Sequence, residues 1–303
     1  MKDEIRRLSE EMARHGYVAD RAIATSVHLA RRMGRPLLVE GEAGVGKTEI
    51  AKVLARLLDA ELIRLQCYEG LDVHTALYEW NYQKQLLRIR LGEAEGTPAG
   101  EIEETIFSRE YLMERPLLRA ITGEEPPVLL IDEIDRADEE FEAFLLELLS
   151  DFQVSVPELG TIRATARPHV VLTSNSTREL SDALRRRCLY LWIDYPSLEK
   201  EMEILRLRRP ELEAVLGERV GRFVRRLREE QLYKTPGVAE TLDWAEALQE
   251  LGVEELEPEV LEATAGCLLK DRHDLASLRG EGLRRVLAEA LEEAGGTDGR
   301  GAG

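Results

Sequence analysis

Two periodicities of apolar residues alternate along the first two thirds of the chain. Between Asp20 and Met33, residues Ile23, Val27 and Ala30 recur at three- and four-residue spacing and share one face, which predicts a helix. A helical opening over 3–14 precedes it. Short apolar runs predict buried strands over 36–40, 61–65, 128–131, 170–173 and 189–193. Strands that alternate with helices are typical of a parallel sheet with helices on both faces.

The pattern changes twice along the chain. Residues 153–164 form two short alternating arms around a Glu-Leu-Gly turn, which predicts a β-hairpin inserted into the α/β framework. After Tyr195-Pro196 only helical patterns remain, over 197–208, 217–231, 238–251, 259–270 and about 276–293. We therefore expect an α/β domain over 1–195, with a five-stranded parallel sheet, and an all-α domain over 196–293. The glycine-rich segment 294–303 is expected to be a disordered tail.

Charge and composition narrow the classes of function. The 303 residues include 41 Lys and Arg against 59 Asp and Glu, a formal charge of −18, with 44% hydrophobic residues. That apolar fraction supports a folded core, and the negative excess disfavours nucleic acid as the main partner. Five glutamates between residues 92 and 104, together with Gly and Pro, indicate a mobile acidic surface segment.

Features that the sequence lacks indicate the cellular location of the protein and the state of its cysteines. No run approaches the roughly 20 apolar residues that span a bilayer, and the start of the chain has no hydrophobic signal core. We therefore expect a cytoplasmic protein without membrane contact. Cys67, Cys188 and Cys267 lie far apart, without zinc or disulfide spacing, and are expected to be buried thiols.

A glycine-rich loop between the first strand and the following helix is the most specific motif. It satisfies the pattern G-x-x-x-x-G-K-[S/T] with Gly41, Glu42, Ala43, Gly44, Val45, Gly46, Lys47 and Thr48. Glycines let backbone amides converge on phosphates, and the positive end of the next helix adds to that field. We predict that Lys47 reaches the β and γ phosphates and that the Thr48 hydroxyl holds Mg²⁺. The alternative is a tight turn with an exposed lysine.

Two successive acids end the third predicted strand, in Leu129-Leu-Ile-Asp132-Glu133. We predict that Asp132 binds Mg²⁺ through water and that Glu133 polarises the water that attacks the γ-phosphate. The alternative is that both acids merely end a strand in solvent. A water-activating acid beside a phosphate loop favours hydrolysis over transfer to an acceptor.

Asn175 follows the fourth predicted strand. The carboxyl ends of parallel strands face one crevice, so Asn175 is expected to lie beside the acids and to orient the same water. The alternative is a turn or capping role, because Ser176 and Glu179 have the spacing of a capping box.

Three successive arginines, Arg185-Arg186-Arg187, end the next helix. They cannot share one helical face, so at least one is expected to project away from the body. In a ring of ATPases such an arginine enters the neighbour's site and neutralises transition-state charge. We assign that role to Arg186 or Arg187. The alternative is stabilisation of a helix C-terminus by cations.

Together these motifs resemble the AAA+ ATPases, in matching order and spacing over about residues 17–293. The hairpin at 153–164 and the segment 68–82 are similar to the insertions of MoxR-type proteins, and that segment together with 235–244 is similar to the CoxD-like branch. The resemblance implies a nucleotide-binding domain followed by a helical lid, and a ring that is most plausibly hexameric. It also implies a partner with a von Willebrand factor A domain and a client among metal-containing enzymes.

One position departs from the family pattern. Many MoxR relatives have a lid arginine after a Ser-Pro pair, which contacts the γ-phosphate from the same subunit. Here Thr235-Pro236 is followed by Gly237. The lid arginine is therefore absent, displaced or replaced by another residue.

These observations lead to one main hypothesis and two rivals. ATP and Mg²⁺ would bind between the α/β domain and the lid, and hydrolysis would drive rigid-body shifts that remodel a client. The aromatic residues at 68, 78, 80 and 82 would contact that client or serve ordinary packing. The rivals are a nucleotide-dependent binding switch with incidental turnover and a DNA-directed AAA+ motor. A GTPase is disfavoured because no Asn-Lys-x-Asp motif occurs.

Overall fold

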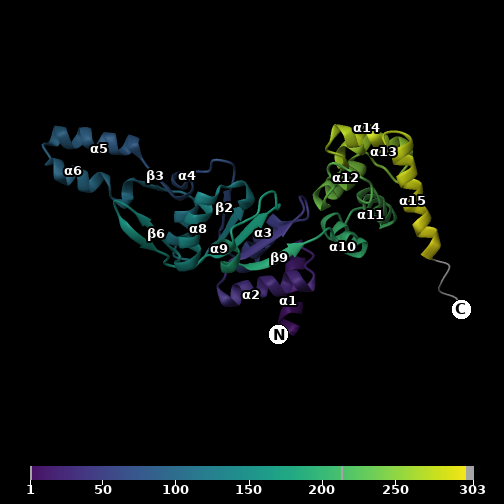
Figure 1. Cartoon of the computed structure of the whole chain (residues 1–303), viewed down its shortest axis with the longest axis horizontal. Coiled ribbons are helices and arrows are strands. Elements are labelled where there is room, and N and C mark those ends of the chain that lie inside the picture. Colours follow the sequence, from purple (N-terminus) through teal and green to yellow (C-terminus); the bar gives the residue numbers. More distant parts are fainter. Residues whose placement is uncertain (1, 213, 298–303) are drawn as a thin grey trace. The chain divides into compact units, whose positions relative to one another are not determined.

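The computed structural model describes residues 2–212 and 214–297 and divides into two compact units (Figure 1). The first unit comprises Met1–Glu11, Asp20–Glu40 and Thr48–Trp192. The second comprises Met12–Ala19, Gly41–Lys47 and Ile193–Gly303. The glycine-rich loop therefore belongs to the second unit, and the helix that follows it belongs to the first.

The first unit is built on a five-stranded sheet in the order β2-β5-β8-β1-β9. Its strands are β1 (Leu37–Gly41), β2 (Leu62–Gln66), β5 (Val128–Asp132), β8 (His169–Ser174) and β9 (Leu189–Ile193). The ladders that join β1 to β8, β2 to β5 and β5 to β8 are parallel. The predicted parallel sheet is confirmed. Strand β8 lies between β1 and β5, so it separates the strand of the loop from the strand of the two acids.

Helices cover both faces of this sheet because alternate side chains of each strand point to opposite sides. The helices are α1 (Lys2–Arg14), α2 (Arg21–Met33), α3 (Lys47–Leu58), α7 (Pro116–Thr122), α8 (Glu139–Asp151) and α9 (Asp182–Arg187). On one face Leu129 and Ile131 share a buried cluster with Phe141 of α8. On the other face Leu37 and Val171 line a small cavity together with side chains of α2 and α3.

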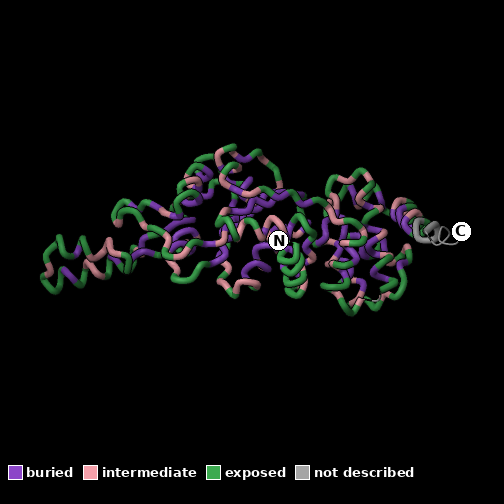
Figure 2. The backbone as a smooth tube through the Cα atoms, turned by 90° about the horizontal axis from the view of Figure 1, so that it is seen from below, coloured by how far each residue is buried: buried purple, intermediate pink, exposed green. Residues whose placement is uncertain are grey.

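An insertion between β2 and β5 contains a helical hairpin. Its elements are α4 (Val73–Leu77), β3 (Tyr78–Trp80), α5 (Tyr82–Glu95), α6 (Ala99–Ile106), the single turn η1 (Arg109–Tyr111) and β4 (Leu112–Glu114). Strands β3 and β4 pair antiparallel at its base. Figure 2 shows exposed residues along much of α5 and α6, at the left of the view.

The segment 92–104 is largely helical and not a loop, whereas its five glutamates are exposed as predicted and its mobility stays a prediction. Residues 92–95 end α5, and residues 99–104 lie in α6. A Cβ at Gly92 would lie 2.5 Å from the Ile102 side chain, so the two helices approach closely where Gly92 has no side chain. Close packing around a buried isoleucine outweighs the polar composition of the segment.

The second hairpin and the helical unit follow the predicted pattern more closely. Strands β6 (Gln153–Val156) and β7 (Gly160–Arg163) form an antiparallel pair. The helices of the second unit are α10 (Leu198–Arg208), α11 (Ala214–Arg228), α12 (Val238–Glu250), α13 (Pro258–Leu268), α14 (Arg272–Leu278) and α15 (Glu281–Thr297). The predicted helical C-terminal region is confirmed, and its core includes Trp244, whose Nε1–H donates to Thr264 Oγ1 at 2.9 Å.

Three smaller predictions need correction. The single helix predicted over 276–293 is two helices, because Gly280 adopts a left-handed φ of 74° between them. Helix α15 continues to Thr297, and the rest of the expected tail, 298–303, lies outside the described residues. Cys67 and Cys188 are buried, but Cys267 is only half-buried.

Within the part of the chain that the structure describes, no helix combines the length and the apolar composition that crossing a membrane requires.

We predict that truncation of a central strand residue costs far more stability than truncation of the same residue type on the surface. Leu130, on β5, is fully buried, whereas Leu29, on α2, is 42% exposed. Leu130→Ala should lower the free energy of unfolding by about 2–5 kcal/mol, because a cavity remains. Leu29→Ala should stay within about 0.5 kcal/mol of wild type. Urea titrations followed by circular dichroism measure both, and equal midpoints would contradict the central position of β5.

Candidate active site

The glycine-rich loop of the second unit encloses its own lysine. Gly44 and Gly46 have left-handed φ values of 74° and 91°, which residues with a side chain rarely adopt. Lys47 begins α3 and is only 7% exposed. Its Nζ donates to the carbonyl oxygens of Gly41 at 2.7 Å and Glu42 at 2.5 Å. The alternative of an exposed lysine on an ordinary turn is therefore wrong.

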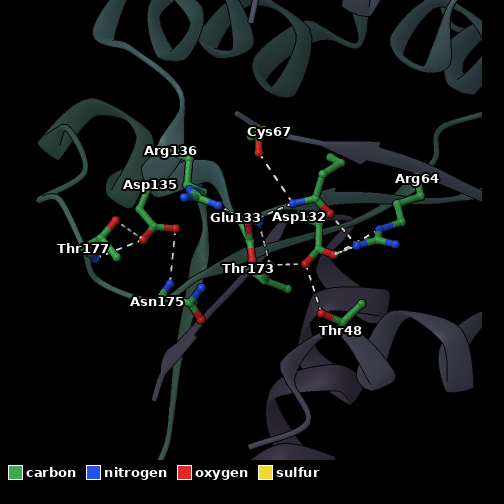
Figure 3. A network of polar contacts seen from close by, with 11 residues as sticks. Thr48, Arg64, Cys67, Asp132, Glu133, Asp135, Arg136, Thr173, Asn175 and Thr177 are labelled. Carbon is green, nitrogen blue, oxygen red and sulfur yellow. Dashed lines mark hydrogen bonds and ion pairs between the residues drawn. The ribbon is translucent and has the colours of Figure 1, made fainter. Parts of the chain in front are cut away.

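The first acid of the pair is buried in the first unit and fully hydrogen-bonded (Figure 3). Asp132 Oδ1 accepts from the hydroxyls of Thr48 at 3.0 Å and Thr173 at 2.5 Å. Its Oδ2 accepts from Nε and Nη2 of Arg64, at 3.0 and 2.5 Å. A buried carboxylate is stable only when paired and hydrogen-bonded in this way. Asp132 is therefore not an acid that ends a strand in solvent.

The contact between Thr48 and Asp132 suits a magnesium ion. A hydroxyl and a carboxylate oxygen, 3.0 Å apart, are the hard oxygen ligands that Mg²⁺ prefers. Protein sites for Mg²⁺ with nucleotides use one or two such groups and leave the other positions to phosphate and water. These two side chains fit that chemistry.

The second acid has a different environment. Glu133 has left-handed backbone angles, φ 55° and ψ 50°, which are uncommon for a residue with a side chain. Its N–H donates to Thr173 Oγ1 at 2.9 Å, and its Oε2 accepts from Gln66 Nε2 at 3.0 Å. The side chain is 34% exposed. Successive acids thus have different surroundings, and only Glu133 is accessible to water. Backbone strain like that of Glu133 clusters at functional sites.

Asp135 anchors the loop that contains Asn175. Its carboxylate accepts from the N–H of Asn175 at 3.2 Å, and from the N–H and hydroxyl of Thr177 at 2.9 and 2.6 Å. Burial raises the pKa of Asp135, but the hydrogen bonds from Thr177 and Asn175 outweigh it and hold the pKa below the ordinary value. Because β8 is adjacent to β5, Asn175 lies at the same edge of the sheet as the acids (Figure 3).

The capping interpretation of this loop is wrong. Ser176 has a left-handed φ of 56°, and its N–H bonds to Ser174 Oγ. Helix α9 is capped instead by Ser181, whose Oγ accepts from the N–H of Leu184 at 3.3 Å. The capping-box spacing at 176–179 therefore does not begin a helix.

A buried ion pair ties the same loop to α8. Glu142 is 1% exposed and accepts from Arg178 and from the N–H of Ser181. Arg178 also donates to the carbonyl oxygen of Ala137 at 2.6 Å. Breaking such a pair would leave an uncompensated buried charge, so the loop between β8 and α9 is held at both ends.

The carboxylates give this region a negative potential. Burial, together with the charges of Asp132, Asp135 and Glu133, raises the pKa of the Cys67 thiol to about 12. Cys67 therefore remains a neutral thiol and is unsuited to nucleophilic chemistry.

The C-terminus of α9 is stabilised by an arginine that is distant in sequence. Arg35 donates to the carbonyl oxygens of Arg186 at 2.6 Å, Cys188 at 3.2 Å and Arg187 at 3.3 Å. A cation at this end interacts favourably with the helix dipole. Arg187 also takes the alternative role considered for the three arginines, because its Nη1 donates to the carbonyl oxygen of Ala183 at 3.2 Å, and Arg35 adds to that stabilisation.

Two of the three arginines are engaged within their own unit. Arg185 donates to both carboxylate oxygens of Glu40 at 3.2 Å, and Glu40 is 2% exposed. Arg187 Nε donates to Ser150 Oγ at 2.5 Å. Within the described residues, the exposed side chain of Arg186 has no hydrogen bond or ion pair.

Several partners of the acids escaped the sequence analysis. Thr173, Arg64, Gln66 and Asp135 all contact Asp132, Glu133 or Asn175. Three of them had a sequence signal. Arg64 and Gln66 interrupt an apolar strand at alternate positions, which places both on one face, and Asp135 continues the acidic run that begins at Asp132.

Comparisons with known proteins agree with this fold. Residues 36–188, about half of the chain, match the AAA domain (dynein-related subfamily). The gas vesicle ATPase GvpN of Haloferax mediterranei is 26% identical over 209 residues, which are 65% of this chain and 57% of that protein. The denitrification regulatory protein NirQ of Pseudomonas aeruginosa is 26% identical over 183 residues, which are 58% of this chain and 61% of that protein.

A third relative is a much longer protein. The chloroplastic chaperone protein ClpB3 of Arabidopsis thaliana is 25% identical over 187 residues, which are 57% of this chain and 17% of that protein. The chain therefore spans less than two thirds of the length of each of these relatives. The matched region contains the loop, the two acids, Asn175 and the arginines, and on this match the chain belongs to the AAA domain family, in its dynein-related subfamily.

Proposed function

We propose that this protein is an ATPase that hydrolyses ATP with Mg²⁺ in a ring and uses the energy to remodel a partner protein. The observation that carries the proposal is the hydrogen bond between Thr48 and the buried Asp132, with Glu133 next in sequence and exposed to water. The relative named as a gas vesicle ATPase supports ATP as the substrate.

Each residue of the site has a defined part in the proposed chemistry. Lys47 exchanges the carbonyls of Gly41 and Glu42 for phosphate oxygens. Thr48 and Asp132 hold Mg²⁺, which neutralises charge on the phosphates when bound. Glu133 accepts a proton from the attacking water. The side-chain amide of Asn175 orients that water, and Asp135 fixes the backbone of Asn175.

The geometry of α9 favours Arg186 as the residue that acts in a neighbouring subunit. Arg185 is paired with Glu40 and Arg187 is bonded to Ser150, so Arg186 is the available cation of the three. An arginine that serves a neighbour's site requires an oligomer, and we propose a hexameric ring by family resemblance.

We propose that the protein belongs to the CoxD-like branch of the MoxR family and has the biological role of that branch. The partner would be a protein with a von Willebrand factor A domain, and the client a metal-containing enzyme under maturation. The relatives named as a denitrification regulatory protein and as a chaperone support a role in acting on other proteins.

The insertion provides a surface for such a partner. Tyr78 and Trp80 are buried and serve packing, whereas Tyr68 and Tyr82 are 48% and 63% exposed. Along α5, three leucines add to the apolar surface: Leu86, Leu87 and Leu91, 57%, 59% and 48% exposed. Exposed apolar patches of this kind mark interaction sites.

One prediction separates the binding of ATP from its hydrolysis. Lys47→Ala should abolish ATP binding, because the loop loses its cation. Glu133→Gln should bind ATP as wild type does but lower turnover by about 10²–10⁴-fold, since the amide cannot accept a proton. Fluorescent nucleotide titration and phosphate release measure the two properties. Wild-type turnover in the Gln variant would refute the water-activating role.

Another prediction tests whether neighbouring subunits share active sites. Arg186→Ala should lower turnover by about 10³-fold or more, and Arg187→Ala, the matched control, should lower it far less. Mixing Arg186→Ala subunits with Lys47→Ala subunits should restore part of the activity, because mixed interfaces combine one intact loop with one intact arginine. No restoration at any ratio would show that sites are self-contained.

The third prediction concerns the partner surface. Complexes trapped on the ATP-bound Glu133→Gln protein in its native cell should contain a von Willebrand factor A domain protein. Adding Leu86→Ser and Leu87→Ser should remove that protein, because the apolar surface of α5 is lost. Leu251→Ser is the matched control, since Leu251 is 64% exposed but belongs to the second unit. Equal recovery from both variants, measured by mass spectrometry, would exclude α5 as the contact.

A further inference from the structure

The first turn of α12 lies against the glycine-rich loop, and both belong to the second unit. The N–H of Ala239 donates to the carbonyl oxygen of Gly44 at 3.2 Å. A Cβ at Gly237, the N-cap of α12, would lie 2.8 Å from both Ala43 O and Gly44 Cα. Gly237 has φ −85°, so glycine is required there by the close approach and not by its backbone conformation. The lid arginine of MoxR relatives has no room at this position.

A carboxylate of the same turn lies beside the loop. Glu240 Oε2 accepts from the N–H of Gly237 at 2.9 Å. The same oxygen would lie 2.9 Å from a Cβ built on Gly44. Negative charge therefore lies beside the loop that, in the proposed function, receives the phosphates.

Buried contacts brace this turn against two other helices. Arg228 of α11 donates through Nε to Pro236 O at 2.8 Å, and through Nη1 and Nη2 to Glu201 of α10 at 2.8 and 2.7 Å. Thr241 of α12 donates to Glu201 at 2.9 Å and to Gly237 O at 3.1 Å. Glu201 and Thr241 are at most 1% exposed. A displacement of Gly237 is thus transmitted to α10, α11 and α12.

We propose that Glu240 and Gly237 form a positioning contact that opens when a triphosphate occupies the loop. The inference rests on the proposed nucleotide site and goes beyond it. Glu240 is half-buried, and like charges only a few ångströms apart repel there, so phosphate charge beside Gly44 pushes Glu240 and the start of α12 away. A cation beside the phosphates would attract them, and Glu240 gives the opposite response. Glu240 also weakens triphosphate binding, because the repulsion opposes it.

The bond from Ala239 to Gly44 makes amide exchange a direct readout. In the Glu133→Gln chain, which retains ATP, the first turn of α12 should exchange about fivefold faster with ATP than without it. In Glu133→Gln/Glu240→Gln the amide oxygen still caps Gly237 but the charge is gone. ATP should then leave exchange within about twofold of the free protein, and the Kd for ATP should fall about fivefold. Glu133→Gln/Glu250→Gln, altered at the far end of α12, is the matched control and should behave as Glu133→Gln.

A second pair of variants tests the close approach by itself. Gly237→Ala should make the first turn of α12 exchange fast without any nucleotide, because the added Cβ separates it from the loop. Gly266→Ala, on α13 with open space around it, should leave that exchange unchanged. Slow exchange in Gly237→Ala would overturn the contact.

The outcomes separate the two proposals. Exchange at α12 that is unchanged or slower with bound ATP, or a Glu240→Gln response like that of the control, would overturn the inference and leave the ATPase proposal standing. Failure of ATP to bind, seen as no thermal stabilisation of the Glu133→Gln chain, would overturn both.

Discussion

The site depends on a buried carboxylate that is stable only when hydrogen-bond donors surround it. Asp132 is 3% exposed, and a lone charge at that depth would lose its carboxylate character or destabilise the fold. Hydroxyls from Thr48 and Thr173 and the fork of Arg64 satisfy both oxygens. These donors come from α3, β8 and β2, so the acid cannot be in place until three separate elements have assembled around β5. Folding and formation of the site are therefore the same event in this unit.

The rest of the site is positioned by anchors that offset unfavourable local geometry. Glu133 and Ser176 both have left-handed backbones, which cost free energy for residues with a Cβ. Thr173 holds the first of them, and Asp135 and Glu142 hold the loop that contains the second. The strain persists because these buried hydrogen bonds over-determine the two segments, and the result is an accessible carboxylate beside an inaccessible one.

The sequence was sufficient for the features that are local or periodic. Strand runs, the loop from Gly41 to Thr48 and the two acids could be placed because each is encoded within a few residues. Contacts between distant residues could not be predicted. The pair of Arg185 and Glu40 joins residues 145 positions apart, and no spacing rule relates them. At 92–104 composition predicted the acidic surface correctly but not the backbone, because the packing of Ile102 against Gly92 holds the segment in two helices.

Inferring a residue's role from a family motif is least reliable where that role depends on the sign of a charge. The spacing that identifies a lid position says only that the chain reaches the loop there, and here the chain reaches it with its backbone. Gly237 allows an approach that excludes any side chain, and the acid that this turn brings beside Gly44 is Glu240, held by the N–H of Gly237 at the start of its own helix. Under the proposed function the group beside the phosphates is then an acid, and the buried pair of Arg228 and Glu201 links that turn to α10 and α11.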